Sequence, residues 1–490
     1  MTKTIWLLAA APLALAGCAM GMADTAPLAA GQAAPITAAE RQQGAQANAG
    51  LMAEFGGAYT GPQAAYVERI GRRAAVQSGL SSDANAFDVT LLNSPVNNAF
   101  AVPGGYIYAT RQLVALMNDE AELAAVLGHE VAHVAARHSQ QRQSVTQRNT
   151  LLGALGQAIV GAVGGDSGLA GLLGRGIGTG AQLATLGYSR GQETQSDDLG
   201  IQYLVRAGYD PAALSTMLES LAAQNSLDQR LAGNARTLPE WASTHPDPAS
   251  RIQRAANQAA ATGATGTRNR DAFLTAIDGI MYGDDPAQGV IDGRDFLFPT
   301  GRIAFTVPQG YTMQNGARAV TISGQGAQAQ FATASYSGNI DSYVRSVFSG
   351  LTSGGTTPPV EVQRTTINGI PAATATVRAS SGQTPIDATV VAYAVSGTQA
   401  YHFVIVAAAG QGAGALAPMA QSFRRMTANE ASAIRPRYVR VMTVASGDTV
   451  RSLAQRMAYP DNQLERFLVL NRLSANATLR AGERVKIVAY

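Results

Sequence analysis

The feature that most constrains this chain is the pentapeptide His129-Glu130-Val131-Ala132-His133, which lies in a stretch with helical periodicity. Residues four apart on an α-helix differ by about 40° around its axis, so the side chains of His129 and His133 point the same way and can bind one metal ion. Glu130 lies beside them, where its carboxylate can act as a general base toward water. The pattern therefore predicts a helix over Asp119 to Arg142 that carries a zinc site.

A third ligand is expected further along the chain, because a catalytic zinc site combines three protein ligands with one open position. Glu193 is the best candidate, about sixty residues after His133, since two histidines and one glutamate form a common ligand set. Asp197 follows one helical turn later, where it can accept the free ring N–H of a zinc histidine. We therefore predict a second helix, over Ala181 to Ala207, that presents both carboxylates to the metal.

The HExxH motif followed by Glu193-x-x-x-Asp197 resembles the gluzincin family of zinc metallopeptidases that contains HtpX and the CaaX prenyl protease. Within that family the similarity is closest to the soluble periplasmic branch of the BepA type. The resemblance covers about residues 45–260. This chain differs from the family pattern at three positions, and none of them is a proposed metal ligand. Further family-like segments are Asn98 to Gly105, Tyr188-Ser-Arg190, and Ser243 to Pro246 with Arg251, while the departures are Gly191, Gln195 and Ser196.

The resemblance implies a zinc metalloendopeptidase with one Zn²⁺ per chain, held by His129, His133 and Glu193. The residue pattern predicts one strand over Ala99 to Ala109 with a kink or bulge at Pro103 to Gly105. We expect the extended segment around Asn98 to Tyr106 to pair with substrate backbone as an added strand. His245 matches a loop histidine that can swing onto the zinc as a fourth ligand and exclude water. The alternative is a loop histidine that contacts the substrate or the oxyanion. The substrate strand begins with Asn98, Ala99, Phe100 and Ala101.

The N-terminal sequence predicts a lipoprotein. Residues 1–17 combine a basic start with an apolar run from Ile5 to Leu15, and Leu15-Ala-Gly-Cys18 is typical of a bacterial lipobox. Cys18 is the only cysteine, which excludes a disulfide within the chain and favours a lipid-carrying thioether. Residues 18–40 are then a flexible tether, and Ala19 favours the outer membrane. The expected location is the periplasm, with the protein anchored to the membrane by lipid.

The 490 residues predict a multidomain chain. We expect a mainly α-helical gluzincin metalloprotease domain over 41–262, an α+β accessory domain over 268–430, and a small βααβ domain over 437–490. The last segment resembles a LysM module, which implies peptidoglycan as a partner; a module used only for packing is the alternative. Residues 151–187, rich in glycine, are expected to form a lid or a helical hairpin rather than a membrane span.

Net charge and the positions of the other histidines limit the partners and metal ligands that this chain is expected to have. A net charge of +3 without a basic cluster gives no support for nucleic-acid binding. His138 is expected on the opposite face of the first helix from His129. His402 is expected in an apolar strand of the accessory domain, as a core or surface histidine rather than a ligand. The resemblance implies cleavage of misfolded or unassembled envelope proteins. A peptidoglycan-associated assembly factor or holdase with a structural zinc is the alternative, and a peptidoglycan hydrolase would need a different ligand set.

Overall fold

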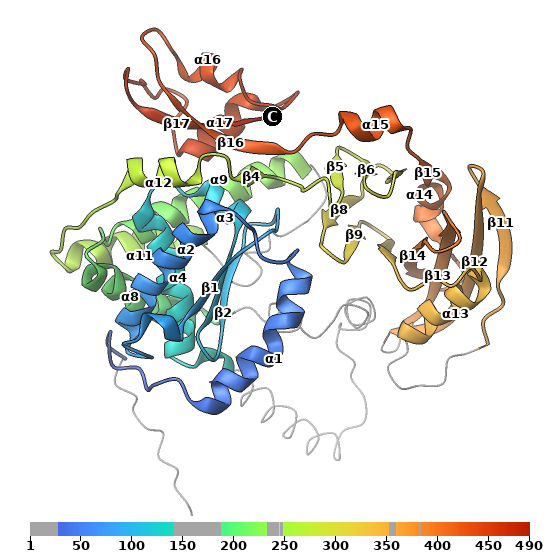
Figure 1. Cartoon of the computed structure of the whole chain (residues 1–490), viewed down its shortest axis with the longest axis horizontal. Coiled ribbons are helices and arrows are strands. Elements are labelled where there is room, and N and C mark those ends of the chain that lie inside the picture. The colour runs from blue at the N-terminus through green and yellow to red at the C-terminus, as the bar shows by residue number, and fades with distance from the viewer. Residues whose placement is uncertain (1–27, 142–187, 233–244, 246–247, 352–358, 382–383) are drawn as a thin grey trace, which may run out of the picture.

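The computed structural model describes residues 28–141, 188–232, 245, 248–351, 359–381 and 384–490. These residues form a mainly helical N-terminal region, a second region built around β-sheets, and a small C-terminal region of two helices and two strands (Figure 1). The expected multidomain chain, with a helical first part and a β-rich later part, is therefore confirmed. Among the described residues, no helix combines the length and the apolar character needed to span a bilayer.

The N-terminal region wraps helices around a three-stranded sheet of order β1-β3-β2, in which β3 is parallel to β1 and antiparallel to β2. Its main core is formed by apolar side chains of the sheet and of the surrounding helices. The elements are α1 (Ala38–Glu54), α2 (Pro62–Ala75), β1 (Asp88–Leu92), β2 (Ala99–Val102), β3 (Tyr106–Thr110), α3 (Arg111–Leu116), α4 (Glu120–Ala135), α8 (Arg190–Ala207), α9 (Ala213–Ala232), α11 (Pro248–Ala261) and α12 (Arg270–Ile277).

The two central helices begin at side-chain caps. The side chain of Asp119 accepts a hydrogen bond from the backbone N–H of Glu122 at the start of α4. Ser189 and Gln192 form a reciprocal capping box at the start of α8. The α4 helix is buried on nearly all sides, and its apolar residues, such as Leu123 and Leu127, belong to the main core. This is typical of a helix in the centre of a domain.

Three predicted elements have different bounds in the structure. The segment from Ala99 to Ala109, expected as one kinked strand, is a hairpin of β2 and β3, because Gly104 and Gly105 have φ values of 96° and 92° and reverse the chain. A Cβ at Gly104 would also lie 2.6 Å from the carbonyl oxygen of Glu40. The α4 helix ends at Ala135 rather than Arg142, and α8 begins at Arg190, whereas residues 142–187 lie outside the described part.

The second region contains a four-stranded and a seven-stranded antiparallel sheet, the latter of order β11-β12-β13-β14-β10-β9-β8. One face of the large sheet packs against the four-stranded sheet and α14, and the other against α13. The elements are β5 (Val290–Asp292), β6 (Asp295–Phe298), β7 (Ile303–Thr306), β8 (Thr312–Asn315), β9 (Ala319–Ser323), β10 (Ala327–Thr333), α13 (Ile340–Leu351), β11 (Gln363–Ile367), β12 (Ile370–Ser381), β13 (Thr384–Ala394), β14 (Ala400–Ala408), α14 (Ala417–Ser422), β15 (Arg424–Arg425) and α15 (Ala428–Ala433).

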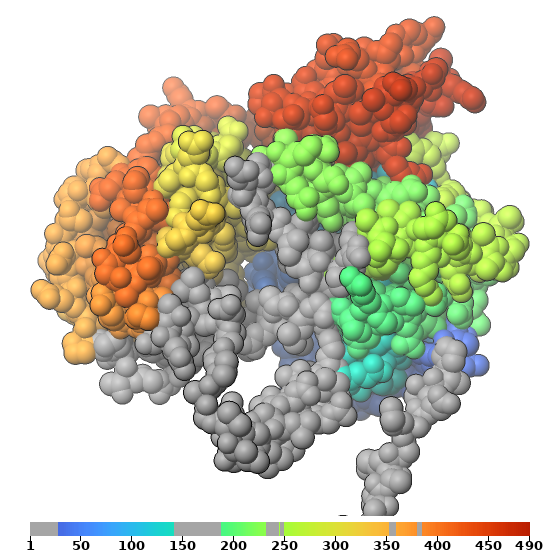
Figure 2. Space-filling view, turned by 180° about the vertical axis from the view of Figure 1, so that it is seen from behind, coloured from blue at the N-terminus to red at the C-terminus, as the bar shows by residue number. Residues whose placement is uncertain are grey.

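The C-terminal region has the element order β16 (Arg437–Thr443), α16 (Val450–Ala454), α17 (Gln463–Asn471) and β17 (Arg484–Ala489). Its sheet is completed by β4 (Met281–Tyr282), which pairs with β16. The region lies directly on the helical region, with α17 against α9 (Figures 1 and 2). Val439 of β16 and Ile280, next to β4, both belong to the main core of the N-terminal region.

Polar contacts at this junction join the C-terminal region to buried groups of the helical region. The Lys486 ammonium donates to the carbonyl oxygens of Ala115, Leu116 and Met117 at the end of α3, at 2.8, 3.1 and 2.5 Å. The Arg472 guanidinium donates to the buried Glu122 carboxylate in the first turn of α4, at 2.8 Å. The C-terminal region is thus attached to the start of the helix that carries the HExxH motif.

Candidate metal centre

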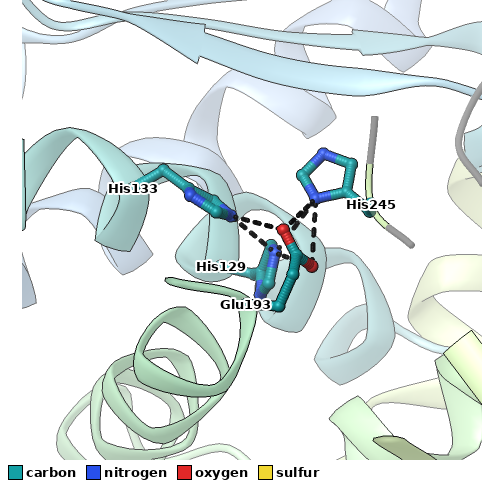
Figure 3. Close-up of side chains that lie close together, drawn as sticks. All are labelled: His129, His133, Glu193 and His245. Carbon is teal, nitrogen blue, oxygen red and sulfur yellow. Dashed lines mark hydrogen bonds and ion pairs between the residues drawn. The ribbon is translucent and has the colours of Figure 1, made fainter. Parts of the chain in front are cut away.

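Four side chains converge beside α4. His129 and His133 project from α4 and Glu193 projects from the first turn of α8, while His245 approaches from the opposite side (Figure 3). All four are buried, and one ligand atom from each lies within 4.8 Å of the others. The structure therefore brings together the three predicted ligands and the predicted fourth one.

The distances between these ligand atoms fit a tetrahedral zinc ion. Zinc binds nitrogen and oxygen at about 2.0–2.1 Å, which places neighbouring ligand atoms of a tetrahedron about 3.3 Å apart. His129 Nε2 lies 3.0 Å from His133 Nε2 and 3.6 Å from Glu193 Oε2, and His133 Nε2 lies 3.4 Å from Glu193 Oε1. His245 Nδ1 lies 3.4 Å from His129 Nε2 and 3.1 Å from Glu193 Oε1. The donor set of three imidazoles and one carboxylate also suits zinc.

The carboxylate of Asp197 holds His129. Nδ1 of His129 lies 3.0 Å from Oδ1 of Asp197, so Nε2 faces the metal group. The buried guanidinium of Arg251 donates to both oxygens of Asp197, at 2.5 and 2.8 Å, and to Glu193 Oε2 at 2.5 Å. Asp197 thus lies beside His129, and Arg251 neutralises two acidic residues of α8, Asp197 and Glu193.

His138 was expected on the opposite helix face, and that prediction is wrong. The chain leaves the helix after Ala135, and Arg137 adopts a left-handed backbone with φ of 53°. His138 therefore turns back, is fully buried, and brings its Nδ1 to 3.0 Å from Nδ1 of His133. Tyr188 also stacks on His133, with ring centroids 3.6 Å apart. No periodic pattern indicated the His138 contact, because it depends on the break at Arg137.

Burial and neighbouring charges set the ionisation of the group. Burial lowers the pKa of His133 and His245, so both imidazoles are neutral and have lone pairs for a cation. Burial alone would raise the pKa of Glu193, but His245, His133 and His129 outweigh it and hold that pKa well below its usual range. Glu193 is therefore an anion, the form in which a carboxyl group binds a metal ion.

Glu130 differs from Glu193. Burial, followed by repulsion from the Glu193 carboxylate, raises the pKa of Glu130 well above its ordinary value. Its Oε1 lies 3.5 Å from Nε2 of His245, whose Nδ1 faces the metal group. The His245 ring thus lies between Glu130 and the metal ligands, where a general base would meet water. A carboxyl group with a raised pKa is suited to both taking and returning a proton near neutral pH.

The structure places the predicted substrate strand beside the helix that carries the two histidines of the metal group, whereas other predicted residues are outside the described part of the chain. Ala99, Phe100 and Ala101 belong to β2, one of the two edge strands of its sheet, beside α4. Asn98 is buried directly before this strand. Cys18 and the glycine-rich segment 151–187 lie outside the described residues.

Residues 62–259 match the model of Peptidase family M48. The chain is 33% identical over 225 residues to the beta-barrel assembly-enhancing protease of Yersinia pestis, covering 45% of this chain and 44% of the relative. It is 34% identical over 197 residues to the protease of that name in Escherichia coli (strain K12), covering 40% and 38%. A match at 31% over 194 residues, covering 39% and 52%, is to the mitochondrial metalloendopeptidase OMA1 of Schizosaccharomyces pombe.

Each match thus spans about half or less of the relative's length. The matched segment contains α2 to α11 and hence all four residues of the metal group. The comparisons therefore support the predicted resemblance to BepA-like zinc metallopeptidases over this part of the chain.

Proposed function

From the peptidase family M48 domain of residues 62–259, we propose that this chain is a zinc-dependent metalloendopeptidase that cleaves unfolded or unassembled envelope proteins. The observation that carries the proposal is the buried group of His129, His133 and Glu193 with Glu130 alongside it. Three protein ligands with a carboxylate base are typical of a hydrolytic zinc site rather than a structural one, which would fill its fourth position permanently.

The residues divide the chemistry between them. Zinc held by His129, His133 and Glu193 would polarise the scissile carbonyl and lower the pKa of water toward neutrality. Glu130 takes the proton of the attacking water and returns it to the leaving amine. Asp197 and Arg251 keep the His129 ring oriented. These roles require no movement of α4 or α8.

The substrate is proposed to bind as an added strand. β2 is an edge strand and lies beside α4. An extended peptide could therefore pair with the backbone of β2 next to the metal group. Main-chain pairing selects for an extended conformation more than for sequence, which suits unfolded proteins. The names of the bacterial relatives, which refer to β-barrel assembly, support outer-membrane proteins as one such class.

We further propose that His245 is a brake. Its Nδ1 completes the four-membered ligand group, and its Nε2 faces Glu130, so the ring blocks the position of water. Release of the His245 ring would open the fourth zinc position. The alternative, contact with substrate or oxyanion, requires the same ring to move away from Glu193.

Location and wall binding remain proposals from the sequence. Lipidation of Cys18 would hold the protein on the periplasmic face of the outer membrane, and the βααβ region would bind glycan as LysM modules do. The loops that follow β16 and precede β17 are exposed, which leaves them accessible to a glycan chain. Sedimentation of residues 28–490 with purified peptidoglycan tests this role, and its absence would assign the region to packing alone.

The experiment that tests the central proposal is cleavage of casein by residues 28–490, before and after chelation. We expect cleavage to stop with the chelator and to return with one equivalent of Zn²⁺. Binding of casein without any cleavage, in the protein and in a His245→Ala variant, would favour the holdase alternative.

A further inference from the structure

His138 occupies a position that the helix alone could not give it. On a continuous helix, positions 133 and 138 differ by about 140° around the axis, so their side chains would diverge. The break at Arg137 removes this constraint, and the break is itself anchored. The Arg137 guanidinium donates to Glu40 at 3.1 Å and to the carbonyl oxygens of Ala34 and Pro35.

Both ring nitrogens of His138 face defined partners. Nδ1 lies 3.0 Å from Nδ1 of His133, and Nε2 lies 3.0 Å from Oε1 of Gln195 on α8. The hydroxyl of Ser196, the next residue of α8, lies 3.4 Å from the same Nδ1 of His138. His138 is fully buried, so no bulk water competes for these contacts.

The positions of the protons follow from the metal group. Nε2 of His133 faces His129 and Glu193, so this nitrogen must keep its lone pair for the metal. Its proton is therefore on Nδ1 and is donated to Nδ1 of His138. His138 then carries its own proton on Nε2 and donates it to the carbonyl oxygen of Gln195. Both hydrogen bonds are made in this one arrangement.

We propose that His138 is the positioning residue of His133, fixing its tautomer and ring orientation for zinc, with Gln195 fixing His138 in turn. The two zinc histidines then differ in their support: Nδ1 of His129 faces the Asp197 carboxylate at 3.0 Å, whereas Nδ1 of His133 donates to a neutral imidazole. α8 supplies Asp197, the ligand Glu193, and Gln195, which holds His138. The proposal rests on the zinc site of the proposed function.

The test is the zinc dissociation constant, measured by competition with a chromogenic chelator, so that no proteolysis is needed. We expect His138→Phe, which keeps an aromatic ring but lacks the acceptor, to bind zinc about 10- to 100-fold more weakly. Gln195→Leu should weaken zinc by a smaller factor in the same direction. Gln195→Glu retains an acceptor and should keep zinc affinity at or above that of the unaltered protein.

Thr194→Val, one residue away on the same helix, is the matched control and should leave the dissociation constant unchanged. If His138→Phe fails to fold, Gln195→Leu with its Gln195→Glu rescue decides the question. The proposal would be overturned if folded His138→Phe had a zinc dissociation constant within twofold of that of the unaltered protein. If His138→Phe does not fold, the same result for Gln195→Leu would overturn it. An unaltered protein that binds zinc but cleaves nothing would refute the proposed function while leaving the role of His138 testable.

Discussion

The Lys486 contact offers a test of how the C-terminal region supports the metal-binding domain. Lys486 is one of only two lysines in the sequence, and its side chain is fully buried against the end of α3. Its ammonium donates to three successive carbonyl oxygens, at Ala115, Leu116 and Met117. Lys486→Met keeps the apolar stem of the side chain but removes the shared donor from all three.

The expected cost is about 3–5 kcal/mol of unfolding free energy. A hydrogen bond from a charged donor contributes about 1.5–3 kcal/mol to the unfolding free energy. The loss of three such bonds is partly offset, because burying the uncharged Met side chain avoids the desolvation cost of the lysine charge. Urea unfolding of residues 28–490, followed by circular dichroism, measures the change. Because Lys486 is the only lysine in this segment, amine-reactive labelling located by peptide mass spectrometry also shows how often the junction opens in the unaltered protein.

Arg480→Met is the control, since Arg480 is exposed in the same region. It should change the unfolding free energy by less than about 0.5 kcal/mol. A loss below about 1 kcal/mol in Lys486→Met, or labelling of Lys486 as fast as in the urea-unfolded chain, would refute the view that this region is a buttress of the metal-binding domain.

Three further predictions concern buried residues. Arg251→Met leaves the carboxylates of Asp197 and Glu193 without their cation and should lower stability of the zinc-free protein by about 3–5 kcal/mol in urea unfolding; a loss below about 1 kcal/mol would contradict it. Burial lowers the pKa of His402 from 6.5 to about 4, so its contribution to the unfolding free energy is fully present above pH 6.5. This free energy should fall by about 1.4 kcal/mol per pH unit as the pH drops from 6.5 toward 4. His402→Gln should remove this slope, and an unchanged slope would show another group to be responsible. His245→Ala should raise casein cleavage severalfold, whereas a fall at unchanged zinc content would assign His245 to the substrate or the oxyanion.

The metal ligands could be predicted because their relation is local. His129 and His133 lie one turn apart on a single helix, and Glu193 and Asp197 repeat that spacing on another. Such pairs share a face wherever the helices lie in the fold. The sequence could not show how the two helices meet, and the resemblance to a known family supplied that step.

The errors come from backbone reversals and from contacts between distant residues. Periodicity continued the first helix past Arg137, but the left-handed conformation there ends it and carries His138 back to the metal group. Two glycines turned an expected strand into a hairpin. The attachment of the C-terminal region depends on pairs such as Arg472 and Glu122, 350 positions apart, which no local pattern reveals.

This attachment changes how the C-terminal region should be studied. Its sequence suggests a module that could be removed without effect elsewhere, yet Val439 lies in the main core and β16 pairs with β4. Deleting residues 437–490 would expose that core and remove the partner of Glu122. Substitutions in the exposed loops after β16 and before β17 are therefore the appropriate test of glycan binding.

The most direct measurement of the central claim is the zinc content and casein cleavage of Glu130→Gln. Glu130 is no ligand in the proposed site, so the variant should retain about one zinc per chain, while losing the proton transfers that cleavage requires. Glu193→Ala is the comparison and should lose both zinc and cleavage. Retained zinc with cleavage reduced at least about a hundredfold is the predicted result. Cleavage by purified Glu130→Gln at the rate of the unaltered protein would contradict the proposed mechanism.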